Sequence, residues 1–125
     1  MTIHEILSCS GIKPDFKAEI SSFLHLCEDL EDLTEQENKA ILSDEFYSDR
    51  RAAYKKVVLL DRFEAQTVRI FKRAKAEAPD NFVLHTFLIK RVQDFQARLK
   101  INTGLHLHML RTNPCYGGGD PVICH

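Results

Sequence analysis

The chain has 125 residues and a formal net charge of −1, with 44% hydrophobic and 28% charged residues. This length fits one domain, and the composition excludes a collagen-like chain, a chain that is disordered as a whole and a disulfide framework. The balanced charge does not favour nucleic-acid binding, and no apolar run reaches the roughly 18 residues that predict a membrane span.

The first segment, residues 1–12, predicts a short helix or an extended arm. It lacks both the basic start and the sustained apolar run of a signal peptide, so we expect a cytoplasmic protein. The four cysteines fit neither a zinc site nor a redox C-x-x-C motif, so we expect free thiols. They are Cys9, Cys27, Cys115 and Cys124.

The first long helix is predicted from Pro14 to about Leu42. Pro suits a first helical turn, and no Gly or Pro interrupts the residues after it. Apolar residues then alternate at spacings of four and three, which is the heptad pattern of a helix facing a partner helix. The predicted seam is Phe16, Ile20, Phe23, Cys27 and Leu30, and its register continues through Thr34 and Glu37 to Ile41. The capping-box pattern Thr34–Glu37 leaves open a break at Thr34.

The second long helix is predicted to begin after an N-cap at Ser48 or Asp49 and to end near Ala78. Pro79 stops it because proline cannot continue a helix. Its predicted apolar stripe is Tyr54, Val57, Leu60, Phe63, Ile70, Phe71 and Ala74.

The third long helix is predicted to open with Asp80 as its N-cap. Its seam is Leu88, Val92, Phe95 and Leu99, and the same register reaches Asn102, His106 and Met109. Gly104 either lies inside this helix or ends its main part. We therefore predict one helical domain over residues 1–112 and a disordered, Gly- and Pro-containing tail over residues 113–125.

These elements predict an all-α fold, an elongated antiparallel bundle of three long helices. Charge is divided unevenly among them, with a net of −8 over residues 15–47, +5 over residues 48–78 and +3 over residues 79–112. An acidic helix is thus expected to pair with two basic ones.

Catalytic and metal-binding patterns are missing from the sequence. His106 and His108 are two residues apart, so on a helix they point about 200° apart and do not share a metal ion. The glycines at 117–119 follow no predicted strand, so they do not form a phosphate loop. The acidic run at 28–32 is typical of a solvated helix face. We expect no enzyme activity, no metal and no cofactor.

Apolar residues late in the chain exceed what a narrow seam buries, and such a surplus often presents a surface to another amphipathic helix. The alternative is that these residues close the core or a homodimer. The surplus includes Phe87, Ile89, Leu105, Leu107 and Leu110.

Several short motifs occur in a familiar order. They are Glu37-Asn38 at the end of the first helix, Lys55-Lys56 in the second, Asn81 with Leu84 opening the third, and Tyr116-Gly117 with Gly119. In these motifs the chain resembles the FlgN-like flagellar export chaperones over about residues 16–119. It departs from the pattern at Phe82, where the family often has Gly, and at Val83-Leu84, which replaces a Leu pair.

This resemblance implies a non-catalytic cytoplasmic chaperone for protein export. Such a protein binds the amphipathic terminal helix of a flagellar hook-associated subunit and prevents its premature assembly. If the resemblance holds, the predicted partner-binding residues are Leu105, Leu107, Met109, Leu110 and Tyr116. The alternative interpretation is a homodimeric structural or regulatory helical protein with no export client. Neither interpretation involves nucleic acid or a membrane span.

Overall fold

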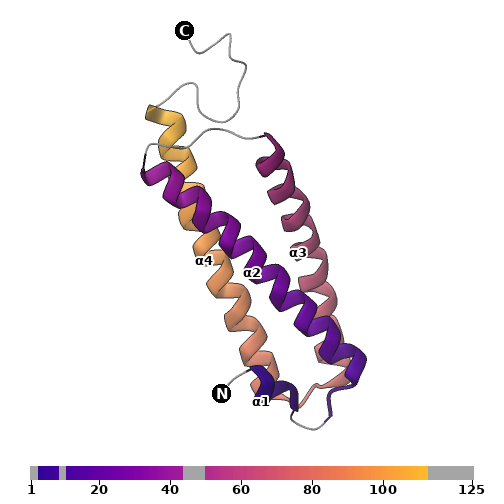
Figure 1. Cartoon of the computed structure of the whole chain (residues 1–125). Helices are drawn as coiled ribbons and strands as arrows, with labels where there is room; N and C mark the ends of the chain where they lie inside the picture. Colours follow the sequence, from indigo (N-terminus) through magenta and orange to yellow (C-terminus); the bar gives the residue numbers. More distant parts are fainter. Residues whose placement is uncertain (1–2, 9–10, 44–49, 113–125) are drawn as a thin grey trace.

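The computed structural model describes residues 3–8, 11–43 and 50–112, and in these ranges the chain forms four α-helices and no strand. They are α1 (Ile3–Ser8), α2 (Pro14–Leu42), α3 (Arg50–Glu77) and α4 (Phe82–Thr112). The three long helices run antiparallel in an elongated bundle, and α1 lies at the end where α4 begins (Figure 1). The predicted all-α bundle is confirmed. The predicted tail over residues 113–125 lies outside the described residues.

The bounds of α2 follow from its sequence. Pro14 is its first residue, and Gly11, with φ of 99°, makes the turn from α1 in a backbone conformation that disfavours other residues. The helix runs unbroken past Thr34 to Leu42, as predicted. The Thr34 hydroxyl donates to the carbonyls of Leu30 and Glu31 inside the helix, so it does not cap a new one.

The turn between α3 and α4 corrects one prediction. The backbone N–H of Leu84 donates to Oδ1 of Asn81 at 3.1 Å, so Asn81 rather than Asp80 caps α4. His85 also approaches this turn, because its Nε2 lies 2.8 Å from the carbonyl oxygen of Ala78. At the other end, α4 passes through Gly104 without a break and reaches Thr112.

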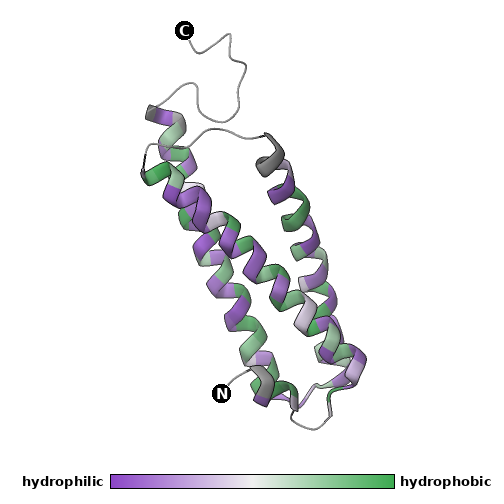
Figure 2. Ribbon diagram, in the orientation of Figure 1, coloured by the Kyte–Doolittle hydropathy of each residue, from purple (hydrophilic) through white to green (hydrophobic). Residues whose placement is uncertain are grey.

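The core is apolar and centred on three phenylalanines in contact. The ring of Phe63 in α3 lies 5.6 Å from that of Phe23 in α2 and 4.6 Å from that of Phe95 in α4. Hydrophobic and hydrophilic residues alternate along the long helices, as an amphipathic bundle requires (Figure 2). Each long helix adds its seam to this core: Phe16, Ile20, Phe23, Cys27 and Leu30 from α2; Phe63, Ile70 and Ala74 from α3; Leu84, Leu88, Val92 and Phe95 from α4.

The N-terminal half of α3 departs from its prediction. Tyr54 and Val57 are 72% and 54% exposed, although the apolar stripe placed both in the core. The described residues of α3 before Phe63 include none that is buried. In Figure 1, α2 and α3 diverge toward the start of α3. Tyr54 and Val57 stay outside the core because Lys56, and not an apolar side chain, occupies the inward position of α3 at that level.

Ion pairs between helices confirm the predicted match of an acidic helix with two basic ones. Arg73 of α3 pairs with Asp15 and Glu19 of α2 and with Glu77 of its own helix. Arg91 of α4 pairs with Glu31 of α2. The pKa of Asp15 is lowered, chiefly because its carboxylate accepts a hydrogen bond from Arg73. These pairs orient α3 and α4 against α2.

None of the described helices contains a stretch that is both long and apolar enough to cross a lipid bilayer.

Candidate functional site

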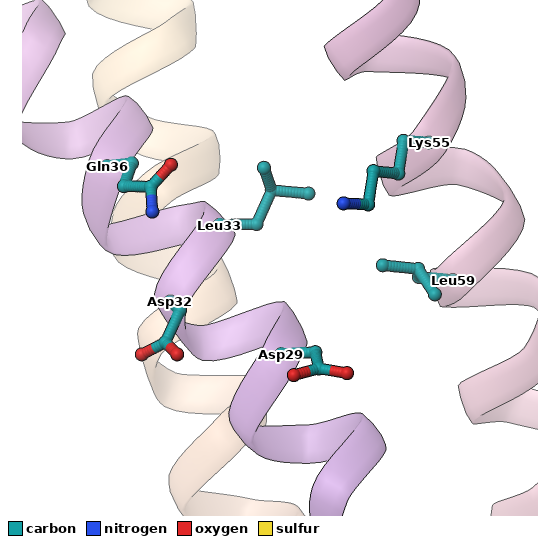
Figure 3. A pocket seen from close by; sticks show the side chains of 6 residues that line it. All are labelled: Asp29, Asp32, Leu33, Gln36, Lys55 and Leu59. Atoms are coloured by element: carbon teal, nitrogen blue, oxygen red, sulfur yellow. The ribbon is translucent and has the colours of Figure 1, made fainter.

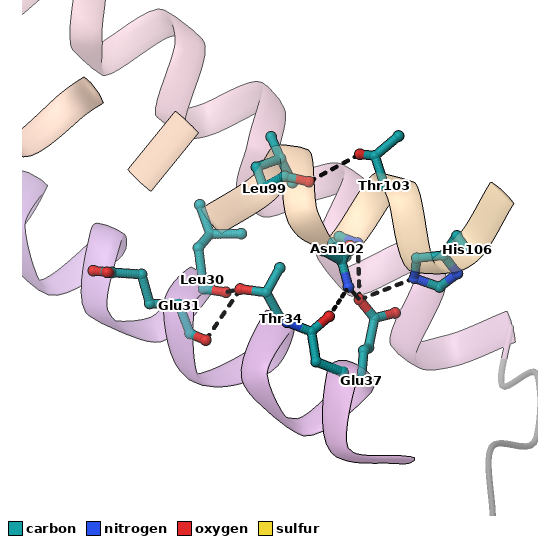
Figure 4. Close-up of polar contacts among 10 residues, drawn as sticks. Leu30, Glu31, Thr34, Glu37, Leu99, Asn102, Thr103 and His106 are labelled. Atoms are coloured by element: carbon teal, nitrogen blue, oxygen red, sulfur yellow. Dashed lines mark hydrogen bonds and ion pairs between the residues drawn. The ribbon is translucent and has the colours of Figure 1, made fainter. Parts of the chain in front are cut away.

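Beyond the phenylalanines the interior changes from apolar to polar. We call this region the polar layer; it consists of Glu37, Asn38, Lys56, Asn102 and His106 (Figure 4 labels Glu37, Asn102 and His106). Asn102 is completely buried, and the side chains of Lys56 and Glu37 are only 15% and 12% exposed. Polar groups this deep must be satisfied by one another, because water does not reach them freely.

Lys56 and Asn102 form the hydrogen bonds that these buried groups require. Lys56 Nζ donates to Glu37 Oε1 at 2.8 Å and also to Oδ1 of Asn102. Asn102 Nδ2 donates to Asn38 Oδ1 at 2.9 Å and to Glu37 Oε1 at 3.4 Å. His106 adds a nitrogen 3.6 Å from the same Glu37 oxygen. Contacts between polar and charged groups, rather than apolar packing, therefore hold the three helices together at this level.

Beside the polar layer lies an open hollow of about 320 Å³, which we call the α2–α3 groove. Its lining comes from two helices: Asp29, Asp32, Leu33 and Gln36 of α2, and Lys55 and Leu59 of α3. Leu33 points across the hollow toward Lys55 and Leu59 (Figure 3). Both leucines are half-buried, whereas the four polar residues are exposed. The groove thus has an apolar floor and polar edges.

Charge in the groove is unbalanced. Asp29 and Asp32 form no ion pair with any residue that the structure describes, and Lys55 is the one basic residue in the lining. A partner helix with an apolar ridge would cover Leu33 and Leu59, and its basic residues would meet the two carboxylates. The groove thus combines a small apolar surface with negative charge that has no ion-pair partner among the described residues.

The predicted partner-binding residues lie elsewhere, in the last turns of α4 and beyond. Leu105 and Met109 are half-buried and one turn apart, so they share a face of α4. Leu107 is 49% exposed and lies about 200° around the helix from Leu105. These three residues therefore do not form one continuous surface.

The other two predicted residues are less well described. Leu110 belongs to α4, but its side chain lies outside the described part of the structure, as does the whole of Tyr116. The prediction that they contact a partner stays a prediction.

Sequence reasoning missed the α2–α3 groove. It treated Asp29 and Asp32 as part of a solvated face, and both are indeed exposed. The available signal was the apolar excess at Leu59-Leu60 together with the polar seam positions Glu37 and Asn102. A seam that turns polar on two helices leaves a third helix nothing apolar to pack against, so an opening is expected there.

In the described residues, no three of His, Cys, Asp or Glu lie together in a way that would hold a metal ion. Cys27 is completely buried, and burial raises its pKa to about 11. It behaves as the small core residue that its seam position predicted.

Comparison with known proteins gives no family assignment. No protein-family model, curated protein or solved structure matches this chain.

Proposed function

We propose that this protein is a non-catalytic chaperone that binds an amphipathic helix of a partner protein in the α2–α3 groove. The observation that carries the proposal is the apolar floor formed by Leu33 and Leu59, which lies open where α3 has no buried side chain of its own. A fourth helix laid in the groove would bury both leucines and complete the bundle at this end.

The resemblance to FlgN-like export chaperones indicates which client helix would bind in the groove. The client would be the terminal helix of a flagellar hook-associated subunit, held in the cytoplasm so that it does not assemble before export. Such a segment is disordered when free and amphipathic when helical, so it offers the apolar ridge that the groove lacks. The acidic edge at Asp29 and Asp32 favours a client helix with basic residues beside that ridge.

The test is a binding titration with a fluorescent peptide that spans the terminal helix of a hook-associated subunit. We expect Leu33→Asp with Leu59→Asp to weaken binding at least tenfold, because the charge removes the apolar floor. The matched control is Phe82→Asp with Val83→Asp, which places the same two charges on exposed apolar residues at the start of α4. Circular dichroism checks that each variant keeps its helices. Equal affinity for the groove variant and the control would show that the peptide does not bind there.

A second pair of variants separates the groove from the predicted surface on α4. Leu107→Asp with Leu110→Asp abolishes binding if the end of α4 contacts the client, and leaves it unchanged if the groove alone does. If wild-type protein binds none of the terminal peptides, the chaperone proposal itself is wrong. The homodimeric interpretation without a client would then stand alone.

A further inference from the structure

An exposed stripe on α3 takes no part in the bundle. It consists of Asp61, Glu64, Val68, Lys72 and Lys75, which we call the α3 stripe, and all five residues are exposed. Their spacings are three, four, four and three residues, so they follow one line along the helix surface. This line lies about 140° around the helix axis from Arg73, which pairs with α2. The stripe therefore faces away from α2.

The order of charges along the stripe is self-complementary. Two acidic residues precede Val68 and two basic residues follow it, at mirror-image spacings. When two copies of α3 lie antiparallel with Val68 against Val68, Asp61 of one copy meets Lys75 of the other, and Glu64 meets Lys72. Two-fold symmetry repeats each pair, since the same surface serves both subunits.

We propose that the protein forms an antiparallel homodimer through the α3 stripe, with Val68 at the two-fold axis.

Within one chain these charges are left without partners. None of the four charged stripe residues forms an ion pair with any other residue that the structure describes. Asp61 and Glu64 are also three residues apart, as are Lys72 and Lys75, so like charges are neighbours on the helix. A second copy brings an opposite charge to each of these residues and so offsets both repulsions. This distinguishes the stripe from Arg69 and Arg73, whose charges are already paired within the bundle.

α4 carries an exposed apolar residue at the same level. Lys56 bonds Asn102 and Phe63 contacts Phe95, and this antiparallel register places Val68 level with about residue 90. Ile89 lies there, is 47% exposed, and stands about 200° around α4 from Arg91, which pairs with α2. Ile89 therefore faces away from α2, as the α3 stripe does.

The test uses charge exchange. Asp61→Lys with Glu64→Lys makes the stripe entirely basic, and Lys72→Glu with Lys75→Glu makes it entirely acidic. Sedimentation equilibrium at low salt should show a wild-type dimer and a dissociation constant raised at least tenfold in each variant. An equimolar mixture of the two variants should recover the dimer, because the basic stripe then faces the acidic one. The quadruple variant, in which all four charges are exchanged, should also dimerise.

The control is Asp29→Lys with Asp32→Lys, which changes the net charge as much as the basic stripe variant does, but on the edge of the α2–α3 groove. It should keep the dimer, with helicity checked by circular dichroism as for the other variants. A wild-type protein that stays monomeric at the highest soluble concentration would overturn the proposal, as would a mixture that fails to dimerise. No client peptide enters this experiment, so its outcome is independent of the proposed chaperone function.

Discussion

Cys27 illustrates how burial controls the chemistry of a single side chain. Its thiol is completely enclosed, and desolvation raises its pKa to about 11, against the opposing effect of the positive charge on Arg91. Since the thiolate is the reactive form, we expect maleimide at pH 8 to leave Cys27 unmodified in the native protein and to modify it in urea. Peptide mass mapping measures this residue by itself. Rapid labelling of Cys27 without denaturant would contradict the complete burial of its side chain.

The same shift has a consequence for stability. The folded protein holds this proton more tightly than the unfolded chain, whose thiol has a pKa of about 9. The contribution of Cys27 is therefore complete below pH 9 and is lost as the pH rises from 9 toward 11. Cys27→Ala should flatten the pH dependence of the free energy of unfolding in that interval, as measured by urea denaturation.

Phe63 and Tyr54 test the core residue by residue. Both belong to the predicted apolar stripe of the second long helix, but Phe63 packs between two other rings and Tyr54 is 72% exposed. We expect Phe63→Ala to lower the free energy of unfolding by about 3–5 kcal/mol, because it removes a buried ring and leaves a cavity. Tyr54→Ala should cost less than about 0.5 kcal/mol. Urea denaturation compares them, and equal losses would contradict the observed exposure of Tyr54.

At the scale of the helices, local sequence predicted α2 well and α3 only in part. The ends of α2 and its whole seam are coded locally, by Pro14 and an uninterrupted heptad pattern. In α3 the apolar pattern pointed to Tyr54 and Val57, whereas the inward position belongs to Lys56. Lys56 points inward because Glu37 of α2 and Asn102 of α4 accept hydrogen bonds from its ammonium group. That information is spread over the chain and is not visible in the periodicity of one helix.

The polar layer therefore predicts an asymmetry between single and paired substitutions. Lys56→Met leaves the half-buried carboxylate of Glu37 without its cation, and we expect a loss of about 3 kcal/mol in the free energy of unfolding. Adding Glu37→Met removes the unpaired charge and should restore most of that loss, since apolar side chains of similar volume often replace a buried pair without cost. Urea denaturation of the two variants and the wild type forms the comparison. A double variant no more stable than Lys56→Met would show that the pair itself stabilises the bundle.

The candidate site was harder to predict than the fold for the same reason. The α2–α3 groove depends on how two helices separate, and that separation follows from the inward Lys56. From the sequence, apolar surplus pointed instead to the end of α4, where Leu105 and Leu107 turn out to lie on different sides of the helix. Which surplus apolar residues form one surface depends on how the helices that carry them are arranged in space.

Across the whole molecule, a net charge of −1 conceals strong attraction between helices. Residues 15–47 carry a net of −8, and the two basic segments after them carry +5 and +3. Two of the resulting pairs among the described residues have an exposed basic member, Arg69 with Glu19 and Arg98 with Glu31. The distance over which charges act falls from about 10 Å at 0.1 M salt to about 3 Å at 1 M, so these exposed pairs are screened first.

We therefore expect sodium chloride to lower the thermal midpoint of unfolding, with most of the change below about 0.5 M. Arg69→Gln with Arg98→Gln removes the exposed cations of two pairs and keeps Arg73 and Arg91, which are shielded. Each exposed pair contributes only about 0–1 kcal/mol, so the variant loses little stability at low salt, and its midpoint should depend less on salt than that of the wild type. Calorimetric scans at matched protein concentration measure both slopes, and recording them on the Val68→Asp background, where the proposed dimer contact is removed, keeps dissociation from contributing. Identical slopes would mean that the attraction between the acidic and basic helices resides in the shielded pairs alone.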